Sequence, residues 1–273
     1  MAVTMADISK LRTMTGAGMM DCKNALNEAE GNFDKAIEII RKKGQAIAAK
    51  RSDREASEGC VLSASNGEFA AVVAIKCETD FVAQNADFIA LTQSILDAAM
   101  ANKIADKEAL LALAIDGRSI ADLITDRSGI TGEKMELGFY EVVNGAATVA
   151  YIHPGNKLAT VVAFNEALDA QVAREVAMQV AAMNPIAVKR DEVPANIIAT
   201  ELEVGREKAR QEGKPEAMLD KIAEGRLNKF YKESTLLEQD FIKDAKVSVQ
   251  QYLKQVSASL TATAFKRVTL NEE

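Results

Sequence analysis

The sequence predicts an α+β protein on the basis of three observations. The first is a run of short amphipathic helical segments near the start, and the second is a pair of apolar strands, each followed by an Ala-rich helix. The third is a long, highly charged stretch interrupted by Gly213-Lys214-Pro215. Together they predict an N-terminal three-helix domain, two related core subdomains, each a β-meander plus a helix, and a protruding antiparallel helical hairpin. We expect domains at residues 1–54 (with the linker), 55–140 and 141–273, the last including the hairpin at about residues 193–230.

Composition limits the class of protein. The chain has 273 residues, 48% of them hydrophobic, and a net charge of -7. The acidic balance argues against a nucleic-acid-binding surface, because neutralising phosphates needs clustered Lys and Arg. No apolar run approaches the length of a membrane span, no export signal is visible, and the widely spaced Cys22, Cys60 and Cys77 fit reduced thiols. We therefore expect a cytoplasmic protein.

The first fifty residues are predicted to form three helices. Thr15–Gly18 breaks the first helix, and the second covers Met19–Ala29 with apolar side chains at helical spacing. The third carries an apolar stripe from Phe33 to Ile40 and is expected to end at Lys42-Lys43-Gly44. The Ala-rich and then charged segment Gln45–Gly59 is predicted to be a helical or flexible linker.

The two strand regions look like one unit used twice. Asn66-Gly67 and Asn144-Gly145 each separate two strand-like segments, and each predicts a two-residue type I′ hairpin, whose central residues both need positive φ. Each region then continues into an apolar strand and an Ala-rich helix, which we place at Phe69–Cys77 with Asp87–Ala99 and at Leu158–Phe164 with Asp169–Met183. An internal duplication explains this pattern better than one large sheet.

The two copies differ where the apolar strand ends. The first copy has Thr79-Asp80-Phe81-Val82, whereas the second has Glu166-Ala167-Leu168-Asp169. Thr79 or Asp80 is suited to cap a new helix, and Phe81 would then lie at its start, close to solvent. The alternatives are that Phe81 turns back into the core and that Asp80 is an ordinary N-cap. Because the second copy lacks the acid and the aromatic residue, the shared fold does not require them.

The rest of the chain is predicted to be helical with one closing strand. Residues 193–230 intersperse acids and bases around a thin apolar stripe, which predicts the helical hairpin, serving either as a protein-contact element or as a solvated lid. A further helix is expected around Val247–Val256. Leu260–Leu270 alternates like a strand that rejoins the second sheet.

Little in the sequence points to catalysis. His153 is the single histidine, and no Cys-x-x-Cys or paired-histidine spacing suits zinc. No phosphate-binding loop is present, and Gly16-Ala17-Gly18 lacks the third glycine of a dinucleotide fingerprint. We therefore expect no chemical active site, no metal and no cofactor. A hydrolase that uses His153 with Cys77 or an acidic residue remains an alternative.

Several longer motifs follow one another in a fixed order. They are Leu11-Arg12 with Thr15–Lys23, Thr79–Asn85 with Phe88, Ala177–Pro185, Gly225-Arg226, and Leu236–Gln239 with Phe241. In this order they resemble the motifs of the bacterial translation elongation factor Ts family over nearly the whole chain. The resemblance implies a guanine-nucleotide exchange factor for the GTPase elongation factor Tu, with a ubiquitin-associated-like N-terminal domain.

The resemblance also implies which residues contact the partner. Phe81 would wedge between helices near the magnesium and phosphate site of elongation factor Tu, Asp80 would assist, and His153 would approach another domain. The expected partner-binding set is Arg12, Met19, Met20, Lys23, Thr79, Asp80, Phe81, Val82, Ile130 and His153. We expect neither direct nucleic-acid contact nor a membrane, and a homodimer or 2:2 complex through the hairpin is possible.

The sequence departs from the family pattern in three places. Lys157 stands where many relatives have arginine, so a point charge replaces a bidentate group. Asp240 stands where proline is usual, and the sequence given ends soon after Leu270, where some members have another helix. The main alternative function is an adaptor in which residues 1–54 alone bind a different protein.

Overall fold

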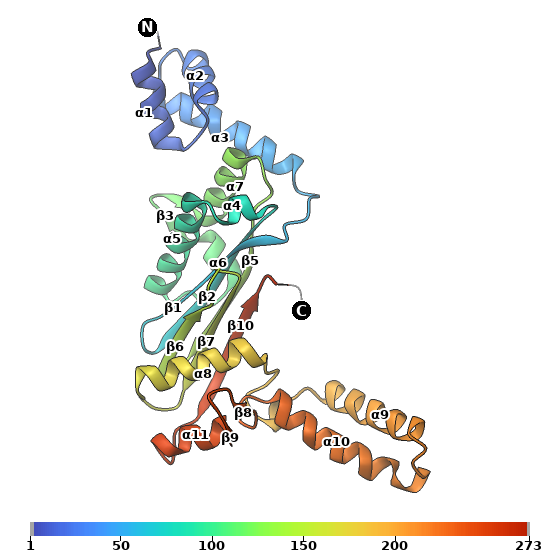
Figure 1. Ribbon diagram of the computed structural model, residues 1–273. Coiled ribbons are helices and arrows are strands. Elements are labelled where there is room, and N and C mark those ends of the chain that lie inside the picture. The colour runs from blue at the N-terminus through green and yellow to red at the C-terminus, as the bar shows by residue number, and fades with distance from the viewer. Residues whose placement is uncertain (1–2, 272–273) are drawn as a thin grey trace. The chain divides into compact units, whose positions relative to one another are not determined.

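The computed structural model describes residues 3–271, which contain both helices and sheets, as an α+β chain requires (Figure 1). Among these residues the chain forms two compact units. One unit joins residues 3–62, 73–141 and 270–271, and the other joins residues 63–72 and 142–269. The division cuts across strands, so each unit is built from several separate stretches of chain.

The N-terminus forms the three predicted helices, α1 (Met5–Thr15), α2 (Met19–Glu28) and α3 (Phe33–Lys50). The first turns of α1 and α3 are capped by side chains: Thr4 forms a capping box with Asp7, and the Asn32 side chain accepts from the N–H of Lys35. Apolar side chains at helical spacing then meet between the helices. The buried set is Ile8, Leu11, Ala17, Cys22, Ala25, Leu26, Ala29 and Ala36.

The predicted end of the third helix at Lys42-Lys43-Gly44 is wrong. Helix α3 continues through Gly44 to Lys50, and Gly44 is buried. A Cβ built on Gly129, in helix α7 (Ile120–Thr131), would lie 2.2 Å from the Gly44 Cα. The two glycines therefore allow two helix backbones to touch, and Gly44 serves a helix crossing rather than a helix end.

The first sheet has the strand order β1-β2-β5, with β1 at Glu58–Ser65, β2 at Phe69–Cys77 and β5 at Glu136–Asn144. A hairpin joins β1 and β2 as predicted, but its turn is not type I′, because Gly67 has positive φ (101°) and Asn66 does not. The Asn66 N–H donates to the Phe69 carbonyl across a three-residue loop. Strand β2 is buried along nearly its whole length, as its apolar run predicts.

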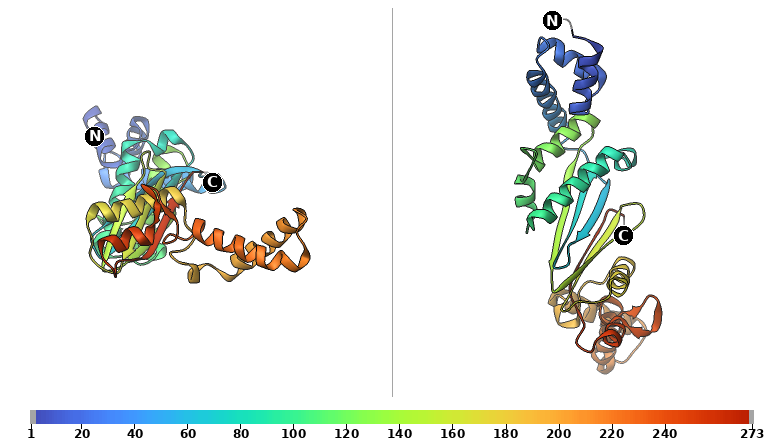
Figure 2. Two further views of the ribbon diagram at one scale, coloured as in Figure 1. Left: turned by 60° about the horizontal axis from the view of Figure 1, so that its bottom comes forward. Right: turned by 90° about the vertical axis from the view of Figure 1, so that its left-hand side faces the viewer.

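Between β2 and β5 the chain is mostly helical. Helix α5 (Ala86–Asn102) lies along this sheet and buries Phe88, Ile95 and Leu96 (Figures 1 and 2). The sequence analysis placed α5 correctly but missed the elements that follow it, which are short and weakly periodic. The segment contains α4 (Asp80–Ala83), α5 (Ala86–Asn102), α6 (Lys107–Ala112), β3 (Ala114–Ile115), β4 (Arg118–Ser119) and α7.

The second sheet has the strand order β10-β7-β6, with β6 at Ala147–Ile152, β7 at Leu158–Phe164 and β10 at Ala262–Thr269. Both neighbours run antiparallel to β7. The prediction that the end of the chain returns to this sheet as a strand is therefore confirmed. Helix α8 (Ala170–Met183) packs on β6 and β7 and buries Val176, Ala177 and Val180.

The predicted hairpin at Asn144-Gly145 is wrong. Strand β5 belongs to the first sheet and β6 to the second, so they are not neighbours. Gly145 has no positive φ; its N–H donates to the Glu68 carbonyl, and the Ala146 N–H donates to the Phe164 carbonyl. Each copy is thus a hairpin, a helical connection and a returning third strand, rather than a meander followed by a helix.

The charged stretch forms the predicted antiparallel helical hairpin of α9 (Ala195–Gln211) and α10 (Leu219–Ser234). The helices approach closely at small side chains, since a Cβ on Gly205 would lie 3.1 Å from the Ala223 Cα. Two ion pairs join the helices, Arg206 with Asp220 at 2.7 Å and Arg226 with Glu212 at 2.6 Å. The opposite charges seen in the sequence therefore face each other across the hairpin.

Shorter elements complete the second unit. Helix α11 appears where a helix was expected. These elements are η1 (Arg190–Glu192), η2 (Glu216–Met218), β8 (Asp240–Phe241), β9 (Asp244–Ser248) and α11 (Val249–Val256). Within residues 3–271, no helix combines the length and the apolar character that crossing a membrane requires.

Candidate functional site

The strand exit after β2 presents a bare aromatic side chain to solvent. Thr79 is the N-cap of the single-turn helix α4, because its hydroxyl accepts from the Val82 N–H at 3.4 Å. Asp80 is therefore the first helical residue rather than the cap, and its side chain is exposed. Phe81 is 84% exposed, the highest value among the large apolar side chains found exposed in residues 3–271. The alternative in which Phe81 turns into the core is thereby contradicted.

The strand exit is fixed from beneath by Glu133, which the sequence analysis did not single out. One carboxylate oxygen of Glu133 accepts from the N–H groups of Glu78 and Thr79, both at 3.1 Å, and the other accepts the Thr79 hydroxyl at 2.6 Å. A single glutamate after the end of a helix carries no sequence signal for this contact. The contact becomes visible only in the folded chain, where the residues after α7 lie beside the residues after β2.

After Phe81 in the sequence, the side chains become buried again. Val82 is half-buried and Ala83 is buried. The Asn85 side chain then accepts from the N–H groups of Asp87 and Phe88 and starts helix α5, whose Phe88 is fully packed. Phe81 therefore projects from a short turn that is anchored on both sides.

The N-terminal candidates divide into surface and supporting side chains. Arg12, Met20 and Lys23 are exposed, and Met20 is 62% exposed on α2. Met19 is half-buried and packs against the apolar centre of the three helices. Three of these four side chains are thus exposed to solvent, and the fourth is half-buried.

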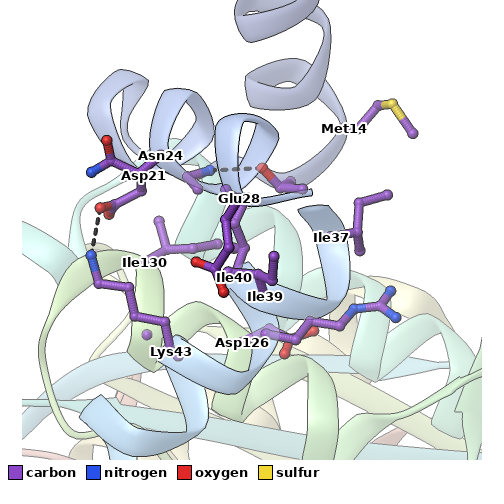
Figure 3. Close-up of a pocket in the computed structure, with 16 residues that line it drawn as sticks. Met14, Asp21, Asn24, Glu28, Ile37, Ile39, Ile40, Lys43, Asp126 and Ile130 are labelled. Carbon is purple, nitrogen blue, oxygen red and sulfur yellow. Dashed lines mark hydrogen bonds and ion pairs between the residues drawn. The ribbon is translucent and has the colours of Figure 1, made fainter. Parts of the chain in front are cut away.

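A cavity of about 380 Å³ lies where α3 passes α7 (Figure 3). Its wall is largely apolar and includes Ile37, Ile40 and Ile130, while Asp21 and Lys43 form an ion pair at 2.5 Å beside it. Ile130 of the predicted set is therefore a half-buried wall residue rather than a free surface side chain. It connects α7 to the N-terminal helices.

His153 lies in the second unit, just after β6. The side chain is exposed, and its Nδ1 lies 3.0 Å from the Tyr151 hydroxyl. The Arg174 guanidinium stands over the Tyr151 ring at 5.2 Å. His153 is thus part of a small polar and aromatic surface group on the second sheet.

Cys60 and Cys77 are buried thiols whose pKa values are raised. Burial raises the pKa of Cys77 to about 12, with the nearby Glu133 charge adding to the shift, and the thiol donates to the Thr79 carbonyl. Burial likewise raises the pKa of Cys60 to about 11. Both thiols are protonated near neutral pH, so a hydrolase built on His153 and Cys77 lacks its nucleophile. Residues 3–271 also hold no group of three or more His, Cys, Asp and Glu side chains able to bind a metal ion.

An exposed acid and aromatic pair on an anchored turn is the kind of surface feature that suits contact with another protein. The sequence model of one protein family, described as Elongation factor TS, matches residues 78–272. Proteins named Elongation factor Ts are 65% identical in Porphyromonas gingivalis, 58% in Azobacteroides pseudotrichonymphae and 50% in Bacteroides fragilis, each match covering 100% of both chains.

The chain belongs to the elongation factor Ts family. It is a guanine-nucleotide exchange factor for elongation factor Tu in protein biosynthesis, without chemistry of its own.

Proposed function

We propose that nucleotide release is driven from Thr79–Val82, with Phe81 as a wedge and Asp80 as its companion against the nucleotide-binding domain of elongation factor Tu. The observation that carries this proposal is the 84% exposure of Phe81 on a turn that is held by the Thr79 cap at one side and by buried Ala83 at the other. An aromatic side chain that enters an apolar pocket gains about 2 to 3 kcal/mol. Such anchors dominate protein interfaces.

The physical basis of exchange is linkage. Magnesium and phosphate are held by a preorganised loop of the GTPase, so a small displacement of that loop removes several favourable contacts together. A factor that binds the displaced form more tightly weakens nucleotide binding by the same ratio that the nucleotide weakens binding of the factor. Phe81 needs only to prefer the displaced form.

The remaining contacts extend the binding surface. Arg12, Met20 and Lys23 offer exposed side chains on the N-terminal helices, which we take as a ubiquitin-associated-like domain of residues 1–54. Met19 and Ile130 support that surface from inside. His153, which lies in the second unit of this chain, contacts a different domain of elongation factor Tu. The complex forms in the cytoplasm, and this chain makes no direct contact with nucleic acid. The thioether of Met20 is flexible and polarisable, which suits an uneven helix surface.

The hairpin is a candidate dimerisation element. Val204 and Met218 are exposed apolar side chains on an otherwise charged hairpin, and this supports a contact with a second copy. Sedimentation of the complex with elongation factor Tu tests it: a Met218→Asp variant should shift a 2:2 complex to 1:1. A wild-type complex of 1:1 stoichiometry would remove this part of the proposal.

Release of labelled GDP from elongation factor Tu tests the wedge. Phe81→Ala should slow the stimulated release about tenfold or more, because about 1.4 kcal/mol of lost contact corresponds to a factor of ten. Val256→Ala, which truncates an exposed side chain on α11, is the matched control and should act as wild type. Full activity of Phe81→Ala would remove the wedge assignment, and a wild-type protein that fails to stimulate release would overturn the whole proposal.

An adaptor that binds through the N-terminal helices alone needs a different test. Removing residues 1–54 is not a clean experiment, because Gly44 of α3 packs on Gly129 of α7. The surface variant Arg12→Ala with Met20→Ala leaves that crossing intact. An adaptor would lose all binding in this variant and none in Phe81→Ala, whereas the proposed exchange factor keeps part of its affinity in both.

A further inference from the structure

The two copies share one structural link at the strand exit. After β7, the Asn165 side-chain oxygen accepts from the N–H of Thr261, which directly precedes the returning strand β10. After β2, a Glu78 side-chain oxygen accepts from the N–H of Lys134 at 2.6 Å, just before the returning strand β5. In both copies the first residue after the middle strand therefore holds the segment that leads into the third strand.

In the first copy, a side chain of the segment before the third strand also accepts hydrogen bonds from the residues after the middle strand. There the Glu133 side chain accepts three hydrogen bonds, from the Glu78 N–H, the Thr79 N–H and the Thr79 hydroxyl. At the corresponding exit of the second copy, the Asn165 N–H donates to the Thr261 carbonyl and the Asn165 side-chain amide donates to the Ser259 carbonyl, while Glu166 accepts from the Ser259 hydroxyl. A carboxylate that accepts backbone N–H groups and a hydroxyl from the strand exit thus occurs in the copy that carries the exposed Phe81.

The Glu133 carboxylate also sets the direction of the Thr79 hydroxyl. That hydroxyl donates its one proton to Glu133, which leaves a lone pair to accept the Val82 N–H and cap α4. A helix of four residues is too short to be stable without such contacts. Hydrogen bonds to an ionised carboxylate are the stronger kind, so Glu133 is the main support of this turn.

The position of Glu133 is itself fixed. Gly132 ends α7 in a left-handed conformation, with φ of 76°, and the Ser128 hydroxyl donates to the Glu133 carbonyl. One turn earlier, Gly129 touches Gly44 of α3. The carboxylate therefore follows directly after a helix whose C-terminal end is packed and capped.

We infer that Glu133 is a positioning residue for nucleotide exchange: it holds Thr79 so that Asp80 and Phe81 project to solvent in one geometry. This inference rests on the proposed role of Phe81. A preorganised side chain loses less conformational entropy when it enters the partner, so loss of the support should weaken exchange without removing any contact to elongation factor Tu.

Stimulated GDP release from elongation factor Tu, with full-length variants, tests the inference. Glu133→Ala should slow release about tenfold, since it removes three hydrogen bonds, one of which orients the Thr79 hydroxyl that caps α4. Glu133→Gln keeps the shape and one acceptor oxygen, and should recover to within about threefold of wild type. Glu136→Ala removes a nearby carboxylate that forms ion pairs with Lys76 and Lys134, and should not change the rate.

A double variant separates positioning from a general structural role. If Glu133 acts through Phe81, Glu133→Ala combined with Phe81→Ala should be no slower than Phe81→Ala alone. Hydrogen exchange at the Val82 amide should also rise in Glu133→Ala, while amides in β7 stay protected. The inference would be overturned if the double variant released GDP more slowly than Phe81→Ala alone. It would also be overturned if the hydrogen-exchange rate of the Val82 amide were the same in Glu133→Ala as in wild type.

A second pair of variants keeps the test sharp if Glu133→Ala folds poorly. Thr79→Ser retains the hydroxyl that bridges Glu133 and Val82, so its stimulated release should be several-fold faster than that of Thr79→Val, which should lose activity as Glu133→Ala does. Equal rates for the two would contradict the inference. Normal activity of Phe81→Ala would instead point to failure of the proposed wedge, so the two failures are distinguishable.

Discussion

The two strand exits of this protein have the same scaffold and different outcomes. After β7, residues 165–169 lead directly into α8, and Leu168 packs against the core of the second unit. After β2, the longer connection 78–85 contains the extra turn α4, and Phe81 points to solvent. The comparison teaches that the duplicated unit supplies the sheet and the helix, while the turn that exposes Phe81 is an addition to one copy.

The surroundings of the two copies differ in the same way. Helix α7, which is confined to the first copy, packs against the N-terminal helix α3 through two glycines. The second copy has instead the buried carboxylate of Glu175, which accepts from Lys243, Tyr252 and Gln171. Close backbone packing supports the first copy, and a buried charge network supports the second.

The largest expected effect is a loss of stability when the contact between Gly129 of α7 and Gly44 of α3 is disturbed. Gly129→Val should destabilise the protein by about 3 kcal/mol or more, because the new side chain would overlap the backbone of Gly44. Urea unfolding followed by circular dichroism measures this change. Gly225→Ala is the control in another helix with free space around it, and it should stabilise by up to about 1 kcal/mol. Similar stability of Gly129→Val and wild type would show that the first copy does not depend on the N-terminal helices.

The next effect concerns the charge network of the second copy. Hydrogen bonds from Lys243 and Tyr252 lower the pKa of Glu175 from its ordinary 4.5 to about 2. A lowered pKa in the folded state means that this stabilisation is complete above about pH 4.5 and is lost as the pH falls towards 2. Unfolding free energies between pH 6 and pH 2.5 should show a loss of about 2 kcal/mol that is absent in Glu175→Gln. An equal loss in that variant would assign the acid sensitivity to other carboxylates.

The smallest expected effect separates the two exits most directly. Leu168→Ala should cost about 1 to 2 kcal/mol, since the side chain is partly buried, whereas Phe81→Ala should change stability by less than about 0.5 kcal/mol. Thermal unfolding of both variants beside wild type gives the comparison. A clear loss of stability in Phe81→Ala would mean that the aromatic ring supports the fold, which would undermine its assignment to the partner.

Local chemistry in the sequence predicted much of this architecture. Apolar periodicity placed α2, α5, α8 and the β2 and β7 strands, because burial of one face is a local pattern. The charged hairpin and the closing strand were also predicted, since Gly213 and an alternating segment act over short distances. For the site, the same patterns identified Thr79 and Phe81 but left open whether the ring is buried.

Errors arose where distant segments decide the conformation. Gly44 looked like a helix end, but the approach of α7 makes it a crossing point. Asn144-Gly145 looked like a hairpin, but β5 has its partner in β2, which lies far earlier in the chain. In both cases the local preference is worth about 1 kcal/mol, and tertiary packing outweighs it.

The sequence by itself determined the α+β class, the duplicated strand and helix pattern and the family. The tertiary structure alone decided that Phe81 is exposed and that Thr79 rather than Asp80 caps α4. It also decided that the Glu133 side chain accepts hydrogen bonds from Thr79. The physical reason is range. Periodicity and turn chemistry are properties of neighbouring residues, whereas the hydrogen bonds of Glu133 join residues 54 and 55 positions apart, and only the folded chain brings them together.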